Sequence, residues 1–149
     1  MEIEKHNDRS SLVGKDLASL SKYLQSLFER LNEASVSWAI LRGAEGLPFY
    51  TRRDVDILVA EQDYKRAAAI VYEVATELGW VRLATFKSMH MCAQWFMYPG
   101  KEPLFLPIEL FLTQAYRGVP LVDATYGLAN RKQMPHGVWV VPDGFSAVT

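Results

Sequence analysis

The chain has 149 residues, half of them hydrophobic, which is enough for one domain with its own core. Sixteen basic and seventeen acidic residues give a net charge of -1, so no overall field attracts nucleic acid or anionic lipid. The single cysteine excludes an internal disulfide framework and fits a reducing compartment, and no apolar run reaches the roughly 18 residues of a membrane helix. We therefore expect a single cytoplasmic domain over residues 1–149, with no membrane partner.

The first half of the chain alternates between helical and extended patterns. Apolar residues spaced by three and four predict an amphipathic helix over residues 10–34. The stretch "VSWAILRG" (36–43) predicts a buried strand that ends at a glycine, and residues 44–53 have the composition of a connecting loop. A second strand is predicted for "DVDILVA" (54–60), followed by a second amphipathic helix over residues 61–79.

The second half is mainly extended. Residues 80–100 predict two strands of a meander, and residues 103–113 predict a further strand. Residues 114–133 predict a loop with a short helix, and residues 137–145 a last short extended piece. This order of elements predicts an α/β (α+β) domain with a mixed β-sheet that helices cover mainly on one face.

The C-terminal segment, residues 119–149, ends with neither a charged tail nor a helix stop. We expect this segment to be truncated or to be completed by a homo-oligomer or another partner. An apolar patch near Val138, Trp139 and Val140 is then expected to be exposed.

Three acids are expected to meet on the open face of the sheet. Alternate side chains of a strand share a face, so Asp54 and Asp56 lie together opposite the aliphatic row that faces the helices. The strand around residues 106–112 alternates in the same way and leaves Glu109 on the open face. If the two strands are neighbours, the three carboxylates converge, and a hard divalent cation such as Mg²⁺ is the usual reason for such a cluster.

Simpler interpretations of the same residues stay open at this point. Asp54 and Asp56 can form ordinary ion pairs with Arg52 or Arg53, and Glu109 can be an exposed residue of a half-solvated strand. A glycine after a buried strand can simply supply a tight turn.

The order of these motifs resembles that of the DNA polymerase β-like nucleotidyltransferase superfamily. The matching stretches are "AILRG" (39–43), "RRDVDILV" (52–59) and "IELFL" (108–112), and the resemblance covers roughly residues 36–118. More narrowly, "LRGAEGLP", "RDVDILV" and "PIELFLTQAYRG" are similar to uncharacterised bacterial nucleotidyltransferase-like proteins. The resemblance implies a nucleotidyltransferase-like fold with the motifs in a core over residues 36–118.

The resemblance also implies roles for individual residues. Asp54 and Asp56 correspond to the paired aspartates that hold Mg²⁺ or Mn²⁺ against the phosphates of an NTP. Glu109 corresponds to the third acid, which helps to position a metal and to activate the attacking hydroxyl. Gly43 matches the glycine whose backbone approaches the triphosphate.

The chain departs from the superfamily pattern after this glycine. Ala44 stands where a serine or a second glycine is usual, so a backbone N–H remains but a hydroxyl donor is lost, which puts efficient catalysis in doubt. Arg42 is either a phosphate contact or a surface residue at the end of a strand.

Other residues give weaker indications. His90 is placed on a strand and interpreted as a satisfied histidine of the sheet, and no histidine pair has zinc-ligand spacing. Cys92 is interpreted as a small buried residue. A set of aromatic residues is assigned mainly to the core rather than to a base-stacking surface, with a few of them able to reach a substrate cleft: Trp38, Trp80, Phe86, Trp95, Phe96, Tyr98 and Phe105.

Three hypotheses for function follow. The first is a magnesium-dependent nucleotidyltransferase that moves a nucleoside monophosphate from NTP to a hydroxyl of a small-molecule or glycan acceptor. Nucleic acid is the less favoured acceptor because the chain shows no cluster of basic residues. The second is a binding or regulatory module of the same fold with weak or no turnover, like the antitoxin members of the superfamily. The third is an unrelated α/β domain whose acids form structural ion pairs.

Overall fold

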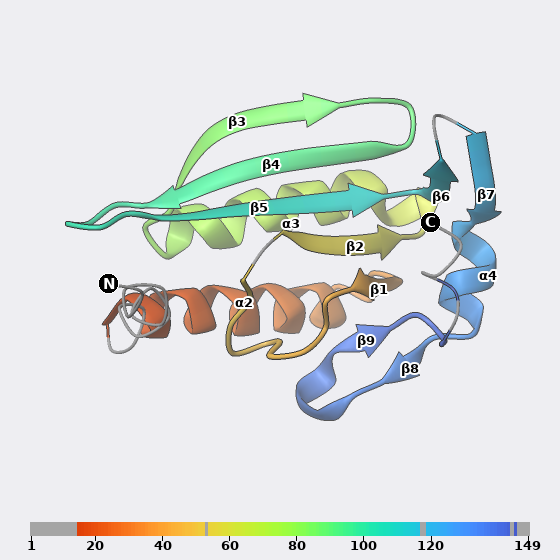
Figure 1. Ribbon diagram of the computed structural model, residues 1–149, viewed down its shortest axis with the longest axis horizontal. Coiled ribbons are helices and arrows are strands. Elements are labelled where there is room, and N and C mark those ends of the chain that lie inside the picture. The colour runs from red at the N-terminus through yellow and green to blue at the C-terminus, as the bar shows by residue number, and fades with distance from the viewer. Residues whose placement is uncertain (1–14, 53, 117–118, 144, 146–149) are drawn as a thin grey trace, which may run out of the picture.

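Two long helices cover one face of a seven-stranded mixed sheet in the computed structural model (Figure 1). The structure describes residues 15–52, 54–116, 119–143 and 145. The sheet has the strand order β3-β4-β5-β2-β1-β9-β8, and β6 and β7 form a separate antiparallel pair. The helices are α2 (Lys15–Glu33), α3 (Tyr64–Glu77) and α4 (Ala124–Ala129). The strands are β1 (Trp38–Arg42), β2 (Val55–Val59), β3 (Val81–Lys87), β4 (Met91–Tyr98), β5 (Leu104–Phe111), β6 (Thr113–Tyr116), β7 (Val119–Asp123), β8 (Lys132–Gln133) and β9 (Trp139–Val140).

The predicted class, an α+β domain with a mixed sheet, is confirmed. β1 and β2 are antiparallel, whereas β2 runs parallel to β5 and β1 runs parallel to β9. The helix predicted over residues 10–34 is present from Lys15 to Glu33, and residues 10–14 lie outside the described part. The helix predicted over residues 61–79 opens with a short 3₁₀ turn, Glu61–Asp63, before α3 begins.

The main core lies between the two long helices and the sheet. Alternate residues of β2 and β5 are buried there, as the strand pattern predicts, including Ile57 and Ile108. Polar side chains also connect the layers: the Tyr23 hydroxyl donates to the Val71 carbonyl, which joins α2 to α3. A smaller cluster lies on the other face, where α4 and the C-terminal segment cover β1 and the end of β2: Ala39, Leu41, Leu58, Ala124, Val141 and Phe145.

The structure corrects the prediction for residues 114–133. A loop with a short helix is expected there, but the segment also contains most of the β6–β7 hairpin and the short strand β8. β6 has only four residues and β7 contains a proline, so neither carries the long apolar alternation that identifies a strand.

The assignment of the aromatic residues mainly to the core is also wrong in part. Trp38, Trp80 and Phe96 are buried, but Phe86, Trp95 and Phe105 are exposed by 60%, 52% and 65%. These three lie on β3, β4 and β5, where the face opposite the two helices has no helix over it in the described structure. Cys92 is buried, as expected.

The C-terminal residues differ from the expectation of an exposed apolar patch. Val138, Val141 and Phe145 are buried, and Trp139 and Val140 are half-buried. Arg131 donates to the carbonyl of Trp38 at 2.8 Å and lies over the Trp139 ring, so this segment is held against β1. Most of the exposed large hydrophobic residues of the described structure lie elsewhere, with the largest group on β3–β5.

Candidate metal centre

The register of β2 and β5 brings the three predicted acids together. Asp56 lies opposite Glu109 in this parallel pair. Asp54 precedes Asp56 by two residues and lies on the same face. One carboxylate oxygen from each of the three residues lies within 4.8 Å of the others. The convergence expected from the strand alternation is therefore present in the structure.

The electrostatics of the cluster favour a proton or a cation. Burial is the largest cause and the adjoining carboxylates of Asp56 and Asp54 add to it, and together they raise the pKa of Glu109 to about 8. At neutral pH Glu109 therefore holds a proton when no cation is bound. Neutralisation by a divalent cation would release that proton.

Asp56 has one paired and one unpaired oxygen. Its Oδ2 accepts a hydrogen bond from Arg42 Nε at 2.8 Å, in an ion pair whose Asp56 side chain is mostly buried. Its Oδ1 is buried and has no hydrogen-bond partner among the described residues. A buried carboxylate oxygen without a partner costs free energy unless a donor or a cation satisfies it.

The donor set fits a hard divalent cation. Mg²⁺ binds oxygen ligands at about 2.0–2.1 Å, so two ligands of one ion lie no more than about 4.2 Å apart. The oxygens of Asp54, Asp56 and Glu109, which lie within 4.8 Å, would need to close by less than about 1 Å. Asp54 is exposed, which leaves one side of the cluster open to a substrate.

Arg42 is the partner that sequence reasoning missed. The alternative interpretation pairs the aspartates with Arg52 or Arg53, but Arg53 lies outside the described residues and Arg52 has no ion pair with either aspartate in the described structure. A β-bulge between Ile40 and Arg42 shifts the register and sets Arg42 opposite Asp56. Without the bulge, Leu41 would take that place, so the sequence pattern gives no sign of the pair.

The loop after β1 has the sharp turn that a glycine allows. Gly43 has a φ of 74°, in the left-handed region, which costs a glycine little. Ala44, the residue that departs from the superfamily pattern, packs its side chain against the main core. Arg42, Gly43 and Ala44 together line a cavity of about 710 Å³ between this loop and the C-terminal segment.

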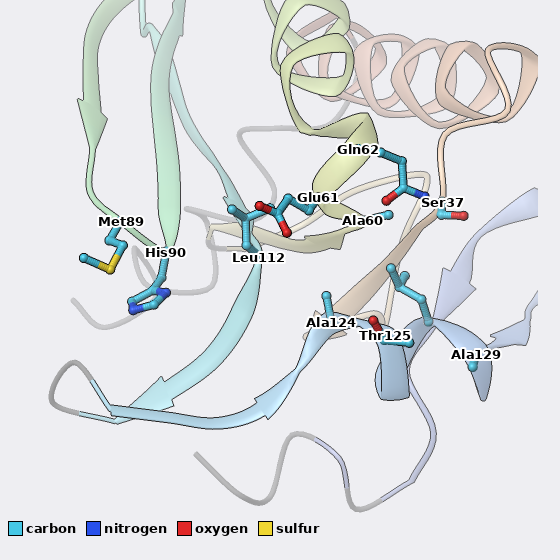
Figure 2. Close-up of a pocket in the computed structure, with 11 residues that line it drawn as sticks. Ser37, Ala60, Glu61, Gln62, Met89, His90, Leu112, Ala124, Thr125 and Ala129 are labelled. Carbon is cyan, nitrogen blue, oxygen red and sulfur yellow. The ribbon is translucent and has the colours of Figure 1, made fainter.

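A second cavity, of about 650 Å³, opens near the other end of β2 (Figure 2). Its walls come from the 3₁₀ turn after β2, from the turn between β3 and β4, and from α4, and they include Glu61, His90 and Thr125. His90 lies in the turn rather than on a strand, which corrects the prediction for this residue. Ala60 in its wall is four residues beyond Asp56, a distance of about 13 Å along a strand.

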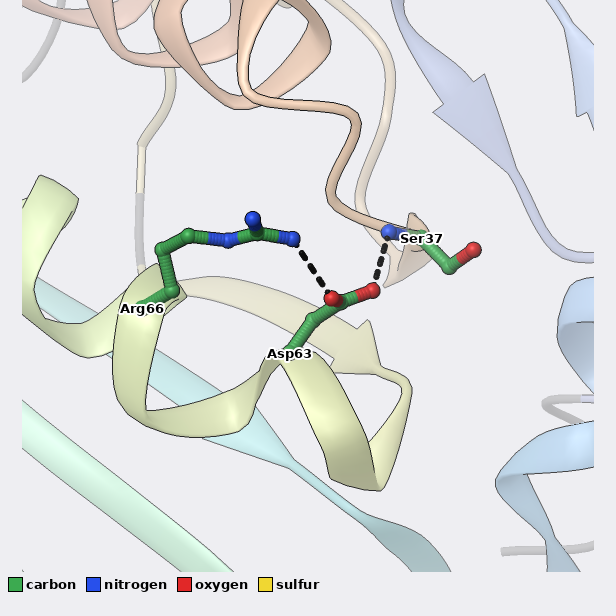
Figure 3. A network of polar contacts seen from close by, with 3 residues as sticks. All are labelled: Ser37, Asp63 and Arg66. Carbon is green, nitrogen blue, oxygen red and sulfur yellow. Dashed lines mark hydrogen bonds and ion pairs between the residues drawn. The ribbon is translucent and has the colours of Figure 1, made fainter.

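Asp63, a buried acid outside the cluster, has a structural role. Asp63 accepts hydrogen bonds from the backbone N–H of Ser37 at 2.9 Å and from Arg66 at 2.7 Å, as Figure 3 shows. Both of its oxygens are therefore satisfied, in contrast to Asp56. No motif in the sequence marks Asp63, which connects the start of α3 to the residue before β1.

Comparison with known proteins assigns the chain to no family. No protein-family model matches the chain, and a search of curated proteins finds no match. Within the described residues, the helices are too short or too polar to cross a lipid bilayer.

Proposed function

We propose that the protein is a nucleotidyltransferase of the DNA polymerase β-like superfamily that uses Mg²⁺ or Mn²⁺. The observation that carries the proposal is the convergence of Asp54, Asp56 and Glu109 around a buried carboxylate oxygen that has no partner. The order of "AILRG", "RRDVDILV" and "IELFL" along the chain adds the expected glycine loop beside the acids. The substrate would be an NTP, and the acceptor a hydroxyl of a small molecule or a glycan.

The three acids and the glycine loop have separate tasks in this reaction. Asp54, Asp56 and Glu109 would hold the divalent cation, which neutralises the charge that develops on the phosphate oxygens. The backbone of Gly43 and the remaining N–H groups of Arg42 would orient the triphosphate. Arg42 also fixes the Asp56 carboxylate through the bond from its Nε.

The bond changes follow from this arrangement. The acceptor oxygen bonds to the α-phosphorus in line, while the bond from that phosphorus to the pyrophosphate oxygen breaks. The acceptor hydroxyl loses its proton in this step. Glu109, which would lose its own proton when the cation binds, would lie beside the acceptor hydroxyl and could take up that proton.

A thermal-shift experiment tests the proposal. Mg²⁺ with one of the four NTPs is expected to raise the melting temperature, because a ligand stabilises the folded state by about 2.7 kcal/mol at about 100 times its Kd. Asp56→Asn is expected to abolish this response. Without ligand, the mutant should lie within about 1 kcal/mol of the wild type, since the charge repulsion relieved offsets the ion pair with Arg42.

The matched control is Glu102→Gln, which neutralises an exposed acid outside the cluster. This variant should respond to Mg²⁺ and NTP like the wild type. A destabilised Asp56→Asn variant that still responds fully to nucleotide would mean that the acids serve only as ion-pair partners, as in an unrelated α/β domain.

A binding or regulatory module of the same fold is the second candidate. Ala44 favours it, because its methyl group packs against the core and supplies no hydroxyl to a phosphate. Such a module would show the same thermal shift with Mg²⁺ and NTP. It would transfer no label from α-³²P-NTP to any acceptor, whereas the enzyme would transfer label and release pyrophosphate.

A further inference from the structure

The exposed face of β3, β4 and β5 carries a group of apolar side chains with no described segment over it. The register pairs Trp95 with Pro107 and Met97 with Phe105 on this face. Phe96 and Leu106, which alternate with them, point into the core. The most exposed members of the group are Phe105, Phe86, Trp95, Leu83 and Val81. We call this group the aromatic face.

The aromatic face is continuous with the acid cluster. Phe86 lies opposite Ala93, Ala93 lies opposite Glu109, and Glu109 lies opposite Asp56. These residues therefore form one row across β3, β4, β5 and β2 on a single side of the sheet. Neighbouring strands are about 4.8 Å apart, so Phe86 lies about 10 Å from Glu109, within the span of a two-ring ligand.

The charges around the aromatic face indicate whether a ligand there would be neutral or charged. Arg82 of β3 points to the helical side, where it bonds Gln94 and lies over the ring of Tyr72 from α3. Lys87 lies opposite Cys92, which is buried on that same side. Among the described side chains of β3–β5 on the aromatic face, the ionisable one is Glu109. Without a bound cation, an anionic ligand would meet repulsion from Asp54 and Asp56 at the end of the row and no counter-charge on the face.

We propose that the aromatic face binds the acceptor of the reaction and that the acceptor is an uncharged oligosaccharide. A sugar ring offers a flat face of C–H groups to aromatic rings, and it carries the hydroxyl that the transfer requires. With one ring over Trp95 and Phe105, the following rings reach toward Glu109 along β5, because Phe105 precedes Glu109 by four residues, about 13 Å along the strand. The acceptor role rests on the proposed nucleotidyltransferase function, whereas sugar binding can be measured without it.

Intrinsic fluorescence provides the test, because Trp95 is exposed while Trp38 and Trp80 are buried and Trp139 is half-buried, and Trp95→Ala shows which part of the signal comes from Trp95. The probes are the neutral trisaccharides maltotriose, cellotriose and chitotriose at millimolar concentration, without metal or nucleotide. At least one is expected to change the Trp95 emission. Phe105→Ala keeps the reporter and should weaken binding about tenfold, and Trp95→Ala should do the same by calorimetry.

Two controls make the result specific. Tyr72→Ala removes an exposed aromatic ring from α3, on the helical side, and should leave sugar binding unchanged. Tri-galacturonate, which is anionic, should bind at least tenfold more weakly than the neutral trisaccharides. Circular dichroism of each variant establishes that it is folded.

Several outcomes would overturn the proposal. These are no binding of any neutral trisaccharide, equal binding of tri-galacturonate, and a dimer in solution that Phe105→Ala converts to a monomer. A thermal shift with Mg²⁺ and NTP but no sugar binding would refute this proposal and leave the nucleotidyltransferase function standing. Sugar binding without any nucleotide response would refute the acceptor role and the nucleotidyltransferase function together, while the aromatic face would remain a sugar site.

Discussion

Glu109 is the residue whose ionisation the structure alters most clearly among the acids of the cluster. Its pKa of about 8 in the folded protein lies well above the ordinary 4.5 that it regains on unfolding. Between these pH values the folded state keeps a proton that the unfolded state has lost. Without metal, the stability of the wild type should therefore fall as the pH rises from about 4.5 to about 8, and level off above that.

Glu109→Gln is the variant that tests this prediction. It keeps the shape of the side chain and removes the titration, so wild type and variant should be equally stable near pH 4. The variant should become progressively more stable than the wild type toward pH 8. The difference is about 1 kcal/mol once solvent screening of this half-buried group is allowed for, or about 4 °C in melting temperature.

The control and the contradicting result are both simple to measure. Melting curves in EDTA from pH 4 to pH 9 compare the wild type with Glu109→Gln and with Glu102→Gln, which lies outside the cluster. The Glu102→Gln curve should run parallel to the wild type. A pH-independent difference between Glu109→Gln and the wild type would show that the carboxyl has an ordinary pKa.

At the scale of elements, Asp63 connects the start of α3 to the segment before β1. This residue occupies the N-cap position of α3, but its carboxylate does not cap its own helix and instead reaches the N–H of Ser37, before β1. Asp63→Ala would leave that N–H without its acceptor, which costs about 1–3 kcal/mol. Arg66→Ala removes only the exposed partner of the ion pair and should cost less than about 1 kcal/mol.

Urea unfolding of these two variants, with Asp63→Asn as a third, measures the difference. The asparagine keeps one acceptor oxygen for Ser37, so its loss should fall between the other two. If Asp63→Ala were no less stable than Arg66→Ala, the bond to Ser37 would contribute nothing measurable to the packing of α3.

The contact between α4 and the sheet depends on the absence of a side chain at Gly127. A Cβ added there would lie 2.8 Å from Leu58 and 2.9 Å from the ring of Phe145. Gly127→Ala should therefore destabilise the protein by about 1 kcal/mol. Overpacking costs about 1–3 kcal/mol, and the better helix propensity of alanine returns about 1 kcal/mol.

Gly100→Ala is the matched control, because a Cβ at that position has no neighbour within 4 Å. Its free energy of unfolding, measured by urea titration, should stay within about 0.5 kcal/mol of the wild-type value. If Gly127→Ala were as stable as Gly100→Ala, α4 would be free to shift away from β2.

The elements that the sequence predicts well are those with long and regular patterns. The helix over residues 15–33 and the alternation in β2 and β5 are such cases. β-Bulges limit the prediction elsewhere, because one extra residue moves all later side chains to the opposite face. A bulge between Arg82 and Ala84 places Phe86 opposite Ala93, on the exposed side, although regular pairing from Arg82 would place it in the core.

At the scale of the whole molecule, the candidate site can likewise be predicted from the sequence only in part. Strand alternation alone places Asp54, Asp56 and Glu109 on one side of the sheet, but it does not say which strands are neighbours. The motif order supplies that expectation, and the parallel pairing of β2 with β5 is the long-range contact that fulfils it. Neither the strand alternation nor the motif order predicts the ion pair of Arg42 with Asp56, because that pair depends on a bulge.

The distribution of charge over the described molecule bears on the proposal of an uncharged acceptor. Four basic side chains of the described structure already have acidic partners, in the pairs Arg30–Glu77, Arg42–Asp56, Arg66–Asp63 and Lys132–Asp143. Arg82 and Arg131 lie over aromatic rings. A net charge of -1 leaves no compensating excess elsewhere in the chain.

Single-stranded RNA is therefore expected to bind weakly, if at all, at physiological salt. Nucleic-acid binding depends on releasing counterions from phosphates with several lysines or arginines along one track, and even basic proteins bind non-specifically with Kd values of about 10⁻⁴–10⁻⁶ M. Here a strand laid along the aromatic face would bring its phosphates toward Glu109, Asp56 and Asp54. Fluorescence polarisation with a labelled mixed-sequence RNA, at low and at physiological salt, measures the affinity. Sub-micromolar binding at physiological salt would contradict the prediction, and with it the choice of an uncharged acceptor, because only an unpaired basic track could produce it.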